Sequence, residues 1–311
     1  MASSPRERVY SEDRLQAGTA LGPSREESPT CTTHVREHSP LYVRYKFCIV
    51  LVDLHTQARS AAGTVLIARN ISKRGRPSSD IQIMPAEFDS YAAAGYSKLL
   101  EDPIRQRFAG SGFFLERKLM LVTELYQQYA TTTELANWLD LGCGEGSLLR
   151  KGKGYFREVA GCDVSDGMIQ RCEGLNVRRQ DSAKQIPFED SSFDLVTAIC
   201  VYHHVDIADQ AALTAEITRV LKSRGIFCVI EHNPLNPVTQ LIVRRSPIDS
   251  RAHLLSAGKV RRLARAARME VLATRYFLYF PERFYSKMAA TEAKLSGLPL
   301  GGQYAVFCRR V

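Results

Sequence analysis

The spacing of hydrophobic residues along the chain predicts two amphipathic helices. Near residues 115–129, apolar side chains recur every three or four positions and therefore share one helix face: Leu115, Leu119, Val122, Tyr126 and Tyr129. A second such face consists of Leu213, Ile217, Val220 and Leu221, and Gly225 follows it as a stop signal. We expect the first helix to cover a sheet edge or the mouth of a binding site, because its apolar stripe needs a partner surface.

Short runs between the helical segments are expected to be strands. Five of these runs lie near residues 137–142, 157–164, 176–180, 193–200 and 225–232. Two further β-rich runs lie near residues 269–280 and 303–309. Because strands and helices alternate along the chain, we expect an α/β fold with a mostly parallel sheet.

The composition indicates the size and the cellular location of the protein more than its function. A chain of 311 residues forms one large domain with additions, or two domains. The formal net charge of +9 permits an anionic partner without requiring one. Eight cysteines without a Cys-x-x-Cys pair indicate reduced thiols and a cytoplasmic location. Near the N-terminus, the apolar run 47–54 is too short to span a membrane, and we expect no membrane span.

A glycine-rich turn carries the most specific chemical signal. Residues 138–149 read Trp-Leu-Asp-Leu-Gly-Cys-Gly-Glu-Gly-Ser-Leu-Leu, so a buried strand ends near Asp140 and opens into Gly142, Gly144 and Gly146. The spacing differs from the Gly-x-Gly-x-x-Gly of dinucleotide-binding folds, and no phosphate-binding Lys follows as in a P-loop. The motif resembles the first motif of class I S-adenosylmethionine (SAM)-dependent methyltransferases. The alternative is a strand-to-helix turn that binds no ligand.

The resemblance implies a fold and a division of the chain. Members of this family have a Rossmann-like α/β fold whose mostly parallel seven-stranded sheet is flanked by helices and has an antiparallel last strand. Residues 136–311 would form this domain, and residues 84–135 a helical N-terminal cap. Residues 1–83 begin with a polar stretch rich in Ser, Pro, Arg and Glu, so we expect a poorly ordered extension.

The implied cofactor is SAM, and acids at successive strand ends would hold it. Asp163 ends the second strand about 20 positions after Asp140, where the analogous dinucleotide fold places its ribose-binding acid. Asp181 ends the third strand and resembles the family's acid on the adenine side. Each acid alone could equally cap a turn. The expected cofactor-binding set is Asp140, Gly142, Cys143, Gly144, Asp163, Val164, Asp181, Ser182 and Cys200.

Histidines after the fourth and fifth strands are the candidates for catalysis. His203 and His204 follow the fourth strand and His232 follows the fifth, at the edge where an acceptor would lie. Histidine can deprotonate a hydroxyl near neutral pH. For His204 the alternative is a packed side chain that holds the turn. Adjacent histidines without a carboxylate cluster at ligand spacing predict no metal site.

The predicted activity is methyl transfer to a small-molecule or glycan-precursor acceptor. The segments 231–239, 246–249 and 298–304 resemble a bacterial subgroup that often accompanies polysaccharide or secondary-metabolite assembly, although Ser246 replaces the usual Cys. A nucleic-acid methyltransferase is one alternative, suggested by Arg261, Arg262, Arg265 and Arg268. It is disfavoured because no Asn/Asp-Pro-Pro-Tyr/Phe motif follows the fourth strand. A non-catalytic SAM-binding partner subunit is another, and the oligomeric state stays open.

Overall fold

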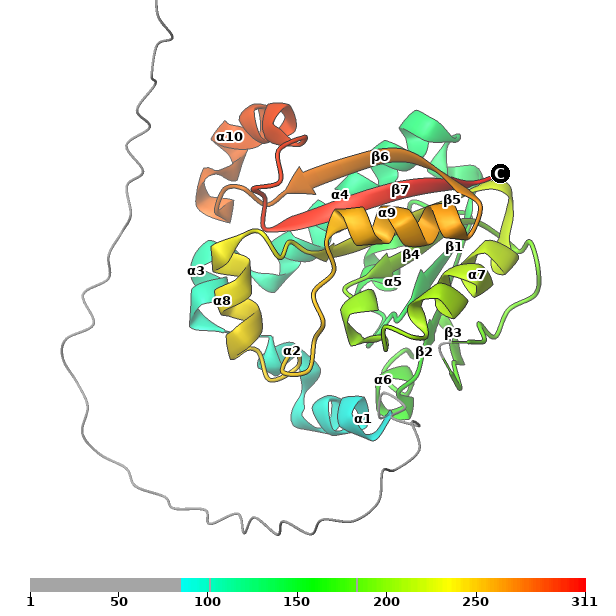
Figure 1. Cartoon of the computed structure of the whole chain (residues 1–311). Coiled ribbons are helices and arrows are strands. Elements are labelled where there is room, and N and C mark those ends of the chain that lie inside the picture. Colours follow the sequence, from blue (N-terminus) through cyan, green and yellow to red (C-terminus); the bar gives the residue numbers. More distant parts are fainter. Residues whose placement is uncertain (1–84, 101, 183) are drawn as a thin grey trace, which may run out of the picture. The chain divides into compact units, whose positions relative to one another are not determined.

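The computed structural model describes residues 85–100, 102–182 and 184–311, so the expected extension at residues 1–83 lies outside the described residues. The centre of the described fold is a seven-stranded sheet with the order β3-β2-β1-β4-β5-β7-β6 (Figure 1). Strand β7 runs antiparallel to both of its neighbours, and the other pairs are parallel. The strands are β1 Asn137–Leu141, β2 Glu158–Asp163, β3 Asn176–Arg179, β4 Phe193–Ile199, β5 Leu221–His232, β6 Met269–Phe277 and β7 Gln303–Arg310. The predicted fold class is confirmed.

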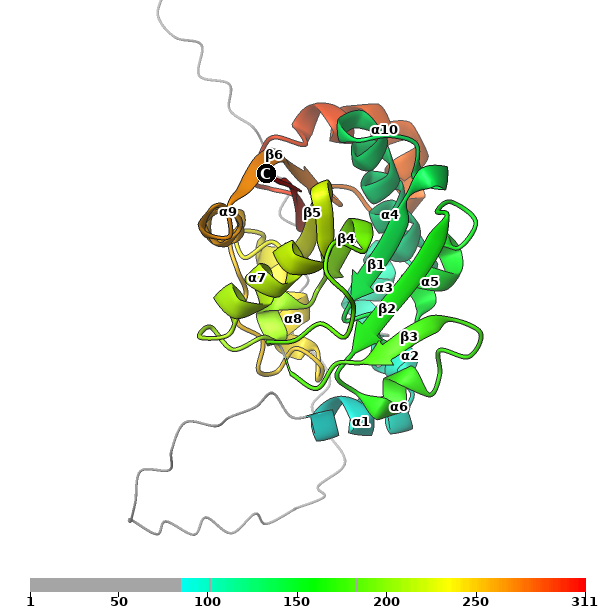
Figure 2. The same cartoon turned by 90° about the vertical axis from the view of Figure 1, so that its right-hand side faces the viewer.

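Helices lie on both faces of this sheet. Figure 2 shows α7 and α9 on one side of the strands and α4 and α5 on the other. The α-helices are α1 Pro85–Ala94, α2 Tyr96–Leu99, α3 Pro103–Phe108, α4 Ser111–Tyr129, α5 Ser147–Gly152, α6 Asp166–Ile169, α7 Gln210–Val220, α8 Pro237–Arg245, α9 Ala257–Ala266 and α10 Glu282–Leu295. Two short 3₁₀ turns are η1 Thr133–Leu135 and η2 Tyr202–His204. Apart from α4, none of the helices in the described part reaches 18 residues, and α4 lacks the hydropathy of a membrane-spanning helix.

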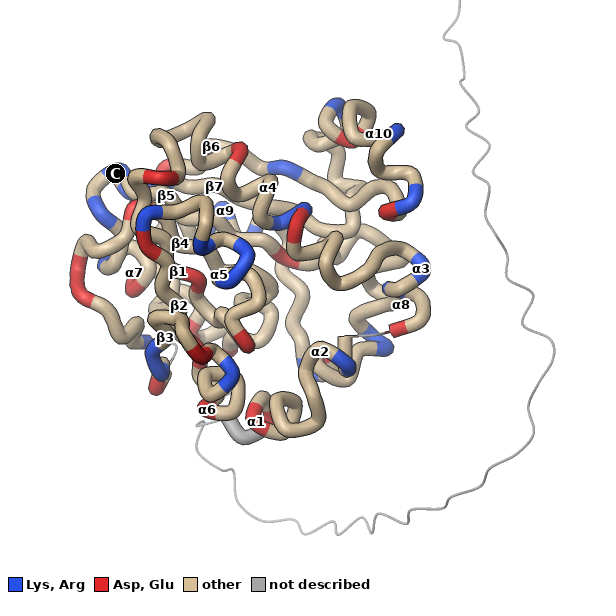
Figure 3. The backbone as a smooth tube through the Cα atoms, turned by 180° about the vertical axis from the view of Figure 1, so that it is seen from behind, with Lys and Arg blue, Asp and Glu red and all other residues tan. Residues whose placement is uncertain are grey.

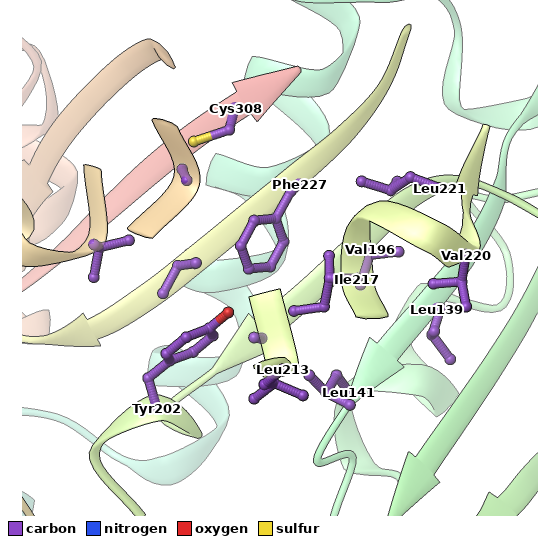
Figure 4. Close-up of a cluster of buried hydrophobic side chains, with 14 of the residues drawn as sticks. Leu139, Leu141, Val196, Tyr202, Leu213, Ile217, Val220, Leu221, Phe227 and Cys308 are labelled. Carbon is purple, nitrogen blue, oxygen red and sulfur yellow. The ribbon is translucent and has the colours of Figure 1, made fainter. Parts of the chain in front are cut away.

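Two apolar cores, one on each face, hold the helices to the sheet. On one face, Leu213 and Ile217 of α7 pack with Phe227 of β5 in a fully buried cluster (Figure 4). On the other, Val122 and Tyr126 of α4 belong to the buried cluster that covers β1 and β5. Each large apolar side chain stabilises the fold by about 1.5–3 kcal/mol when it leaves water. Both predicted apolar stripes therefore cover the sheet.

Strand β5 begins earlier than its sequence indicates. Leu221, expected to end the α7 stripe, already pairs with Phe193 of β4, and the ladder resumes only at Ile226 with Leu195. The additional residues of β5 form an irregularity, in which Arg224 has a φ of 63°. At Gly225 a Cβ would lie 2.8 Å from the backbone oxygen of Lys222, so a glycine is required there. Gly225 thus serves a bulge inside the strand and not the end of the helix.

Candidate active site

The carboxyl ends of β1, β2, β4 and β5 open into one cavity of about 1480 Å³. Parallel sheets bind their ligands at this edge. Figure 1 shows α2, α3 and α8 beyond the strand ends, and residues of all three line the cavity. All twelve residues expected from the sequence line it: Asp140, Gly142, Cys143, Gly144, Asp163, Val164, Asp181, Ser182, Cys200, His203, His204 and His232.

The turn after β1 needs glycine for two different reasons. Gly142 has a φ of 66°, and a Cβ there would lie 2.6 Å from Cγ2 of Val201. Gly144 has a φ of 53° with no heavy atom within 4 Å of where a Cβ would lie, so its backbone is open to a close ligand. The amide of Gly142 donates to the carbonyl of Cys162 at 2.8 Å, which fixes the turn against β2.

Asp163 ties this turn to the second strand. Its Oδ2 accepts a hydrogen bond from the Gly144 amide at 2.8 Å, and its Oδ1 accepts from the Ser165 amide at 3.0 Å. The carboxyl group is buried, and burial raises its pKa although the backbone amides of Ser165, Gly144 and Val164 lower it. A carboxylate can accept about four hydrogen bonds, so each oxygen keeps capacity for a further donor. Asp163 can therefore receive the two hydroxyls of a ribose at the cavity wall.

Asp140 is the second buried acid of the cavity. Its Oδ1 accepts from Thr197 Oγ1 at 2.6 Å, and that hydroxyl accepts from Trp138 Nε1 at 2.8 Å. Burial raises the pKa of Asp140 to about 7, outweighing the lowering effects of Thr197 and Lys118. Asp140 thus titrates near neutral pH, beside the glycine turn.

The remaining expected cofactor residues lie in different surroundings. The side chain of Asp181 is 87% exposed, at the rim of the cavity, with Oδ1 at 3.8 Å from Nε of Arg179. Ser182 lies beside it and accepts from the Lys184 amide through Oγ. Cys143 is buried, and its contact with Cys172 and its burial both raise its pKa, so it is a packing thiol and not a nucleophile.

His203 is held between two carboxylates. Its Nδ1 hydrogen-bonds Glu231, and its Nε2 lies 3.3 Å from Oδ1 of Asp249, with the imidazole completely buried. Burial lowers the pKa of His203, but the two acids outweigh this effect and raise it well above 6.5. His203 is therefore an imidazolium that cannot accept a proton. The expectation that it faces the acceptor as a base is disfavoured by this geometry.

The other two histidines differ in charge and surroundings. Burial, together with the positive charge of His203, lowers the pKa of His204 to about 4, and its ring packs edge-on against Phe88 at 5.2 Å. His204 matches the alternative of a packed histidine. His232 is half-buried, and its Nδ1 lies 3.4 Å from Nε2 of Gln303. Within the described part of the chain it has no carboxylate at ion-pair distance, so, unlike His203, it is not held in an ion pair.

Asp249 is a site residue that the sequence did not indicate. It lies in the loop after α8, and the ligand atoms of Asp249, His203 and His232 all lie within 4.8 Å of one another. Such a trio resembles a metal-ligand set, which the spacing of the histidines did not suggest. Because His203 carries a positive charge between Glu231 and Asp249, we interpret the cluster as a buried ion-pair network that holds a proton.

Cys200 directly follows β4, has a φ of 59° and lies between the cationic Lys118 and the polar Gln303. Its Sγ is 3.7 Å from Nζ of Lys118 and 3.6 Å from Nε2 of Gln303. Burial alone would raise the pKa of this thiol, but Lys118 and His232 lower it to about 7.

The helices before β1 contribute side chains that sequence reasoning missed. Tyr96 of α2, Arg105 of α3 and Lys118 of α4 all line the cavity. Only Lys118 left a signal, because it is a charged residue on the same side of the predicted helix as Leu115 and Val122. The helix α1 is fastened over the cofactor side, since Asp89 accepts from Ser165 Oγ at 2.6 Å.

Comparison with known proteins relates the central part of the chain to a known family. Residues 139–229 match a family model described as a methyltransferase domain. This segment is therefore similar to methyltransferase domains. It comprises β1 to β5 up to Val229, which includes the glycine turn, Asp163 and Cys200, and the cofactor of the family is SAM.

Curated relatives match the methyltransferase domain over about 110 residues. The chain is 33% identical over 109 residues to the uncharacterized methyltransferase YcgJ of Bacillus subtilis, covering 32% of this chain and 42% of the relative. It is 36% identical to the sterol 24-C-methyltransferase of Schizosaccharomyces pombe, covering 30% and 27%. It is 35% identical to the demethylmenaquinone methyltransferase of Lactobacillus johnsonii, covering 33% and 47%. The chain thus spans less than half the length of these relatives.

A solved structure supports the fold over a longer range. A SAM-dependent methyltransferase from Thermotoga maritima superposes with a TM-score of 0.53 at 16% identity, covering 73% of this chain and all of that one. The likeness shows that the fold extends beyond the methyltransferase domain, to most of the described residues.

Proposed function

We propose that this chain transfers a methyl group from SAM to a small-molecule acceptor. The observation that carries the proposal is Asp163, which orders the glycine turn through Gly144 and faces a cavity large enough for a cofactor and an acceptor together. A complete cofactor half and a proton acceptor at the same cavity disfavour a non-catalytic partner subunit.

The residues of the cavity fit the cofactor. Asp163 would hold the ribose hydroxyls, and the open backbone at Gly144 would allow close approach. Lys118, near both Asp140 and Cys200, would pair with the methionine carboxylate. Asp181 would receive the adenine amino group at the rim. We keep residues 84–135 as a helical cap over this half, consistent with α1 to α4.

When bound, SAM supplies a methyl group already activated by a sulfonium. The protein therefore mainly positions the acceptor, and a base removes its proton as the new bond to carbon forms. We assign that base to His232, at the end of β5. The His203–Glu231–Asp249 network would hold the neighbouring turn in place, and His204 would pack beneath Phe88.

The loop beside the cavity bears on the class of acceptor. The loop from Asn233 to Asn236 is tied to the segment 299–301, because Asn233 donates to the carbonyls of Pro299 and Gly301. This tied loop borders the acceptor side, in the region that resembles the bacterial subgroup linked to glycan precursors or secondary metabolites. The described cysteines are free thiols, which is consistent with a cytoplasmic location.

A nucleic-acid acceptor is less well supported. Of Arg261, Arg262, Arg265 and Arg268, none lines the cavity, and α9 packs its buried face on the sheet. Figure 3 shows Lys and Arg interspersed with Asp and Glu over the face seen from behind, unlike a continuous basic stripe.

The test combines cofactor binding with product capture. Calorimetry should show one SAM and one S-adenosylhomocysteine (SAH) site per chain. Incubation with methyl-labelled SAM and fractionated cell extract should then place the label in a small molecule, identified by mass spectrometry. Absence of SAH binding, or label that appears only in nucleic acid, would contradict the proposal.

A further inference from the structure

The acceptor half of the cavity has mostly apolar walls. They come from α2, α3, α4 and α8, with no contribution from the glycine turn. The side chains involved are Leu99, Leu100, Phe108, Phe114, Leu115 and Ile242. Such a lining gains free energy only when an apolar surface of the ligand leaves water.

Arg105 is one of the cations that these helices contribute to the cavity, together with the exposed Lys98 and Arg245 and with Lys118 near Cys200. Nη1 of Arg105 donates to the carbonyl of Leu100 at 2.7 Å, and its guanidinium lies 4.8 Å from the ring centroid of Phe114. Burial lowers the pKa of Arg105, which means that keeping this guanidinium charged in the cavity costs free energy of desolvation. Among the described residues, to which Glu101 does not belong, no carboxylate lies within 4.0 Å of the guanidinium.

The acids nearest to Arg105 are already paired with other cations. Asp102 lies 3.1 Å from Nε of Arg245 and also caps α3 through the amide of Ile104. Asp249 lies 3.3 Å from Nε2 of His203. A guanidinium that keeps free N–H groups in an apolar cavity is suited to bind an anion in a bidentate manner.

We propose that the acceptor is an amphiphile whose apolar body fills this half of the cavity and whose carboxylate or phosphate pairs with Arg105. The inference rests on the proposed methyl transfer, because it takes the space beside the cofactor as the acceptor site. Arg105 and the apolar wall together would orient the acceptor, which places its reactive group toward His232.

The rim of the cavity is apolar as well. Val238 of α8 lines the cavity and is 48% exposed. Leu235 and Leu241, three positions to either side, are 62% and 48% exposed. Val238 and Leu241 are three residues apart on α8 and share a helix face, and Leu235 precedes this helix, so the apolar wall continues outward past the mouth along α8. An apolar ligand would meet this surface before entering.

Probes with one apolar body and different head groups test the inference. We would titrate SAH-loaded protein with dodecanoate, dodecyl phosphate, dodecanol and dodecylammonium, all below their micelle concentrations, with acetate and inorganic phosphate as head groups alone. The two anionic amphiphiles should bind about tenfold or more tightly than dodecanol. Dodecylammonium and the head groups alone should bind weakest.

Variants locate the binding. Arg105→Gln should reduce the affinity for both anionic probes to that for dodecanol, and Arg105→Lys should keep part of the preference. Arg107→Gln is the matched control, because Arg107 is exposed on the same helix and does not line the cavity. Ile242→Trp should fill the apolar space and block all four amphiphiles while SAH still binds.

The outcomes separate this inference from the proposed function. Failure of the wild type to bind SAH contradicts the proposed function. Intact SAH binding with equal affinity for dodecanol and dodecanoate, or an equal loss in Arg107→Gln, overturns the amphiphile inference alone. If Arg105→Gln does not fold, the probe series on the wild type together with Arg105→Lys still decides it.

Discussion

His203 and Glu231 form a hydrogen-bonded ion pair from which solvent is completely excluded. The second carboxylate oxygen of Glu231 accepts from the Tyr202 amide at 2.8 Å, so the pair joins the turn after β4 to the end of β5. Through Asp249 the same imidazole also holds the loop after α8. Three segments that are distant in sequence therefore meet at one positive charge.

Removing that charge should destabilise the fold. His203→Gln leaves Glu231 buried without its counter-ion, and we expect a loss of about 3–5 kcal/mol in the free energy of unfolding, measured with urea. Because the pKa of His203 is raised in the folded state, its contribution is full below pH 6.5 and declines as pH rises through the raised value. The difference from wild type should thus narrow toward alkaline pH. His253→Gln, an exposed change, serves as control, and an equal loss there would refute the assignment.

Asp163→Ala should weaken SAM and SAH binding together. The variant loses a charged acceptor for the ribose and the bond to the Gly144 amide, which corresponds to about 1.5–3 kcal/mol, or roughly ten- to a hundredfold in affinity. Calorimetry on folded protein measures the change. Asp166→Ala, which removes an exposed acid on the neighbouring helix, should bind normally. Unchanged affinity in Asp163→Ala would remove this residue from the site.

His232→Gln should lower turnover without affecting the cofactor. Loss of a general base commonly slows a reaction by about 10²- to 10⁴-fold, and we expect at least a tenfold decrease in kcat with nearly unchanged SAH affinity. A labelled-methyl assay with the captured acceptor measures kcat, and calorimetry measures the SAH affinity. If the variant turns over normally, the acceptor is already nucleophilic at neutral pH and positioning alone is sufficient.

Asp140→Asn should stabilise the empty protein above pH 7. The buried carboxyl has its pKa raised to about 7, so its contribution to stability is full below the ordinary value of 3.8 and is lost as pH rises through 7. The neutral amide cannot ionise and avoids this loss. At pH 8 the free energy of unfolding of the variant should therefore exceed that of the wild type by more than about 1 kcal/mol. Thermal unfolding at pH 5 and pH 8 gives the comparison. A variant less stable than wild type at pH 8 would show that the charged form is needed in the fold.

Cys200 should be the fastest-reacting thiol in the described part of the chain. With a pKa of about 7 it is largely thiolate at pH 8, whereas burial raises the pKa of Cys162 and Cys228. The contact with Cys143 also lowers the pKa of Cys172, but that thiol is buried while Cys200 is partly exposed. Iodoacetamide labelling followed by peptide mass spectrometry reports each site. Lys118→Met should slow labelling because the thiolate loses its cation, and bound SAH should protect it. Equal labelling of Cys162 would contradict the prediction.

Local patterns predicted the fold because the hydrophobic spacing reports directly on burial. The stripe of Leu213 and Ile217 and the glycine turn each depend on a few adjacent residues, so their structure could be inferred. The site was predicted less completely. Asp249 and Arg105 come from loops and short helices whose position depends on tertiary packing. Arg105 has no sequence pattern that separates it from an ordinary surface charge, and Asp249 falls in the segment 246–249, which indicated a resemblance but no role for this acid.

The histidines are a second case in which the sequence predicted only part of the site. Their chemistry was evident from the sequence, but their protonation was not, because it depends on Glu231 and Asp249. Adjacent residues consequently have opposite states, with His203 charged and His204 neutral. Gly225 misled for a similar reason, since a bulge within β5 has the same glycine signature as a helix end.

The insertion of β7 between β5 and β6 has a consequence for the order in which the protein matures during translation. Gln303, the first residue of β7, lies beside His232 and Cys200, and Gly302 accepts from the Asn233 amide. The ribosome makes these residues last among the seven strands. A nascent chain can pair β1 to β5 while synthesis continues, but its acceptor side stays open until β7 has emerged. The acceptor side is therefore completed only after β7 has been made, later than the cofactor side.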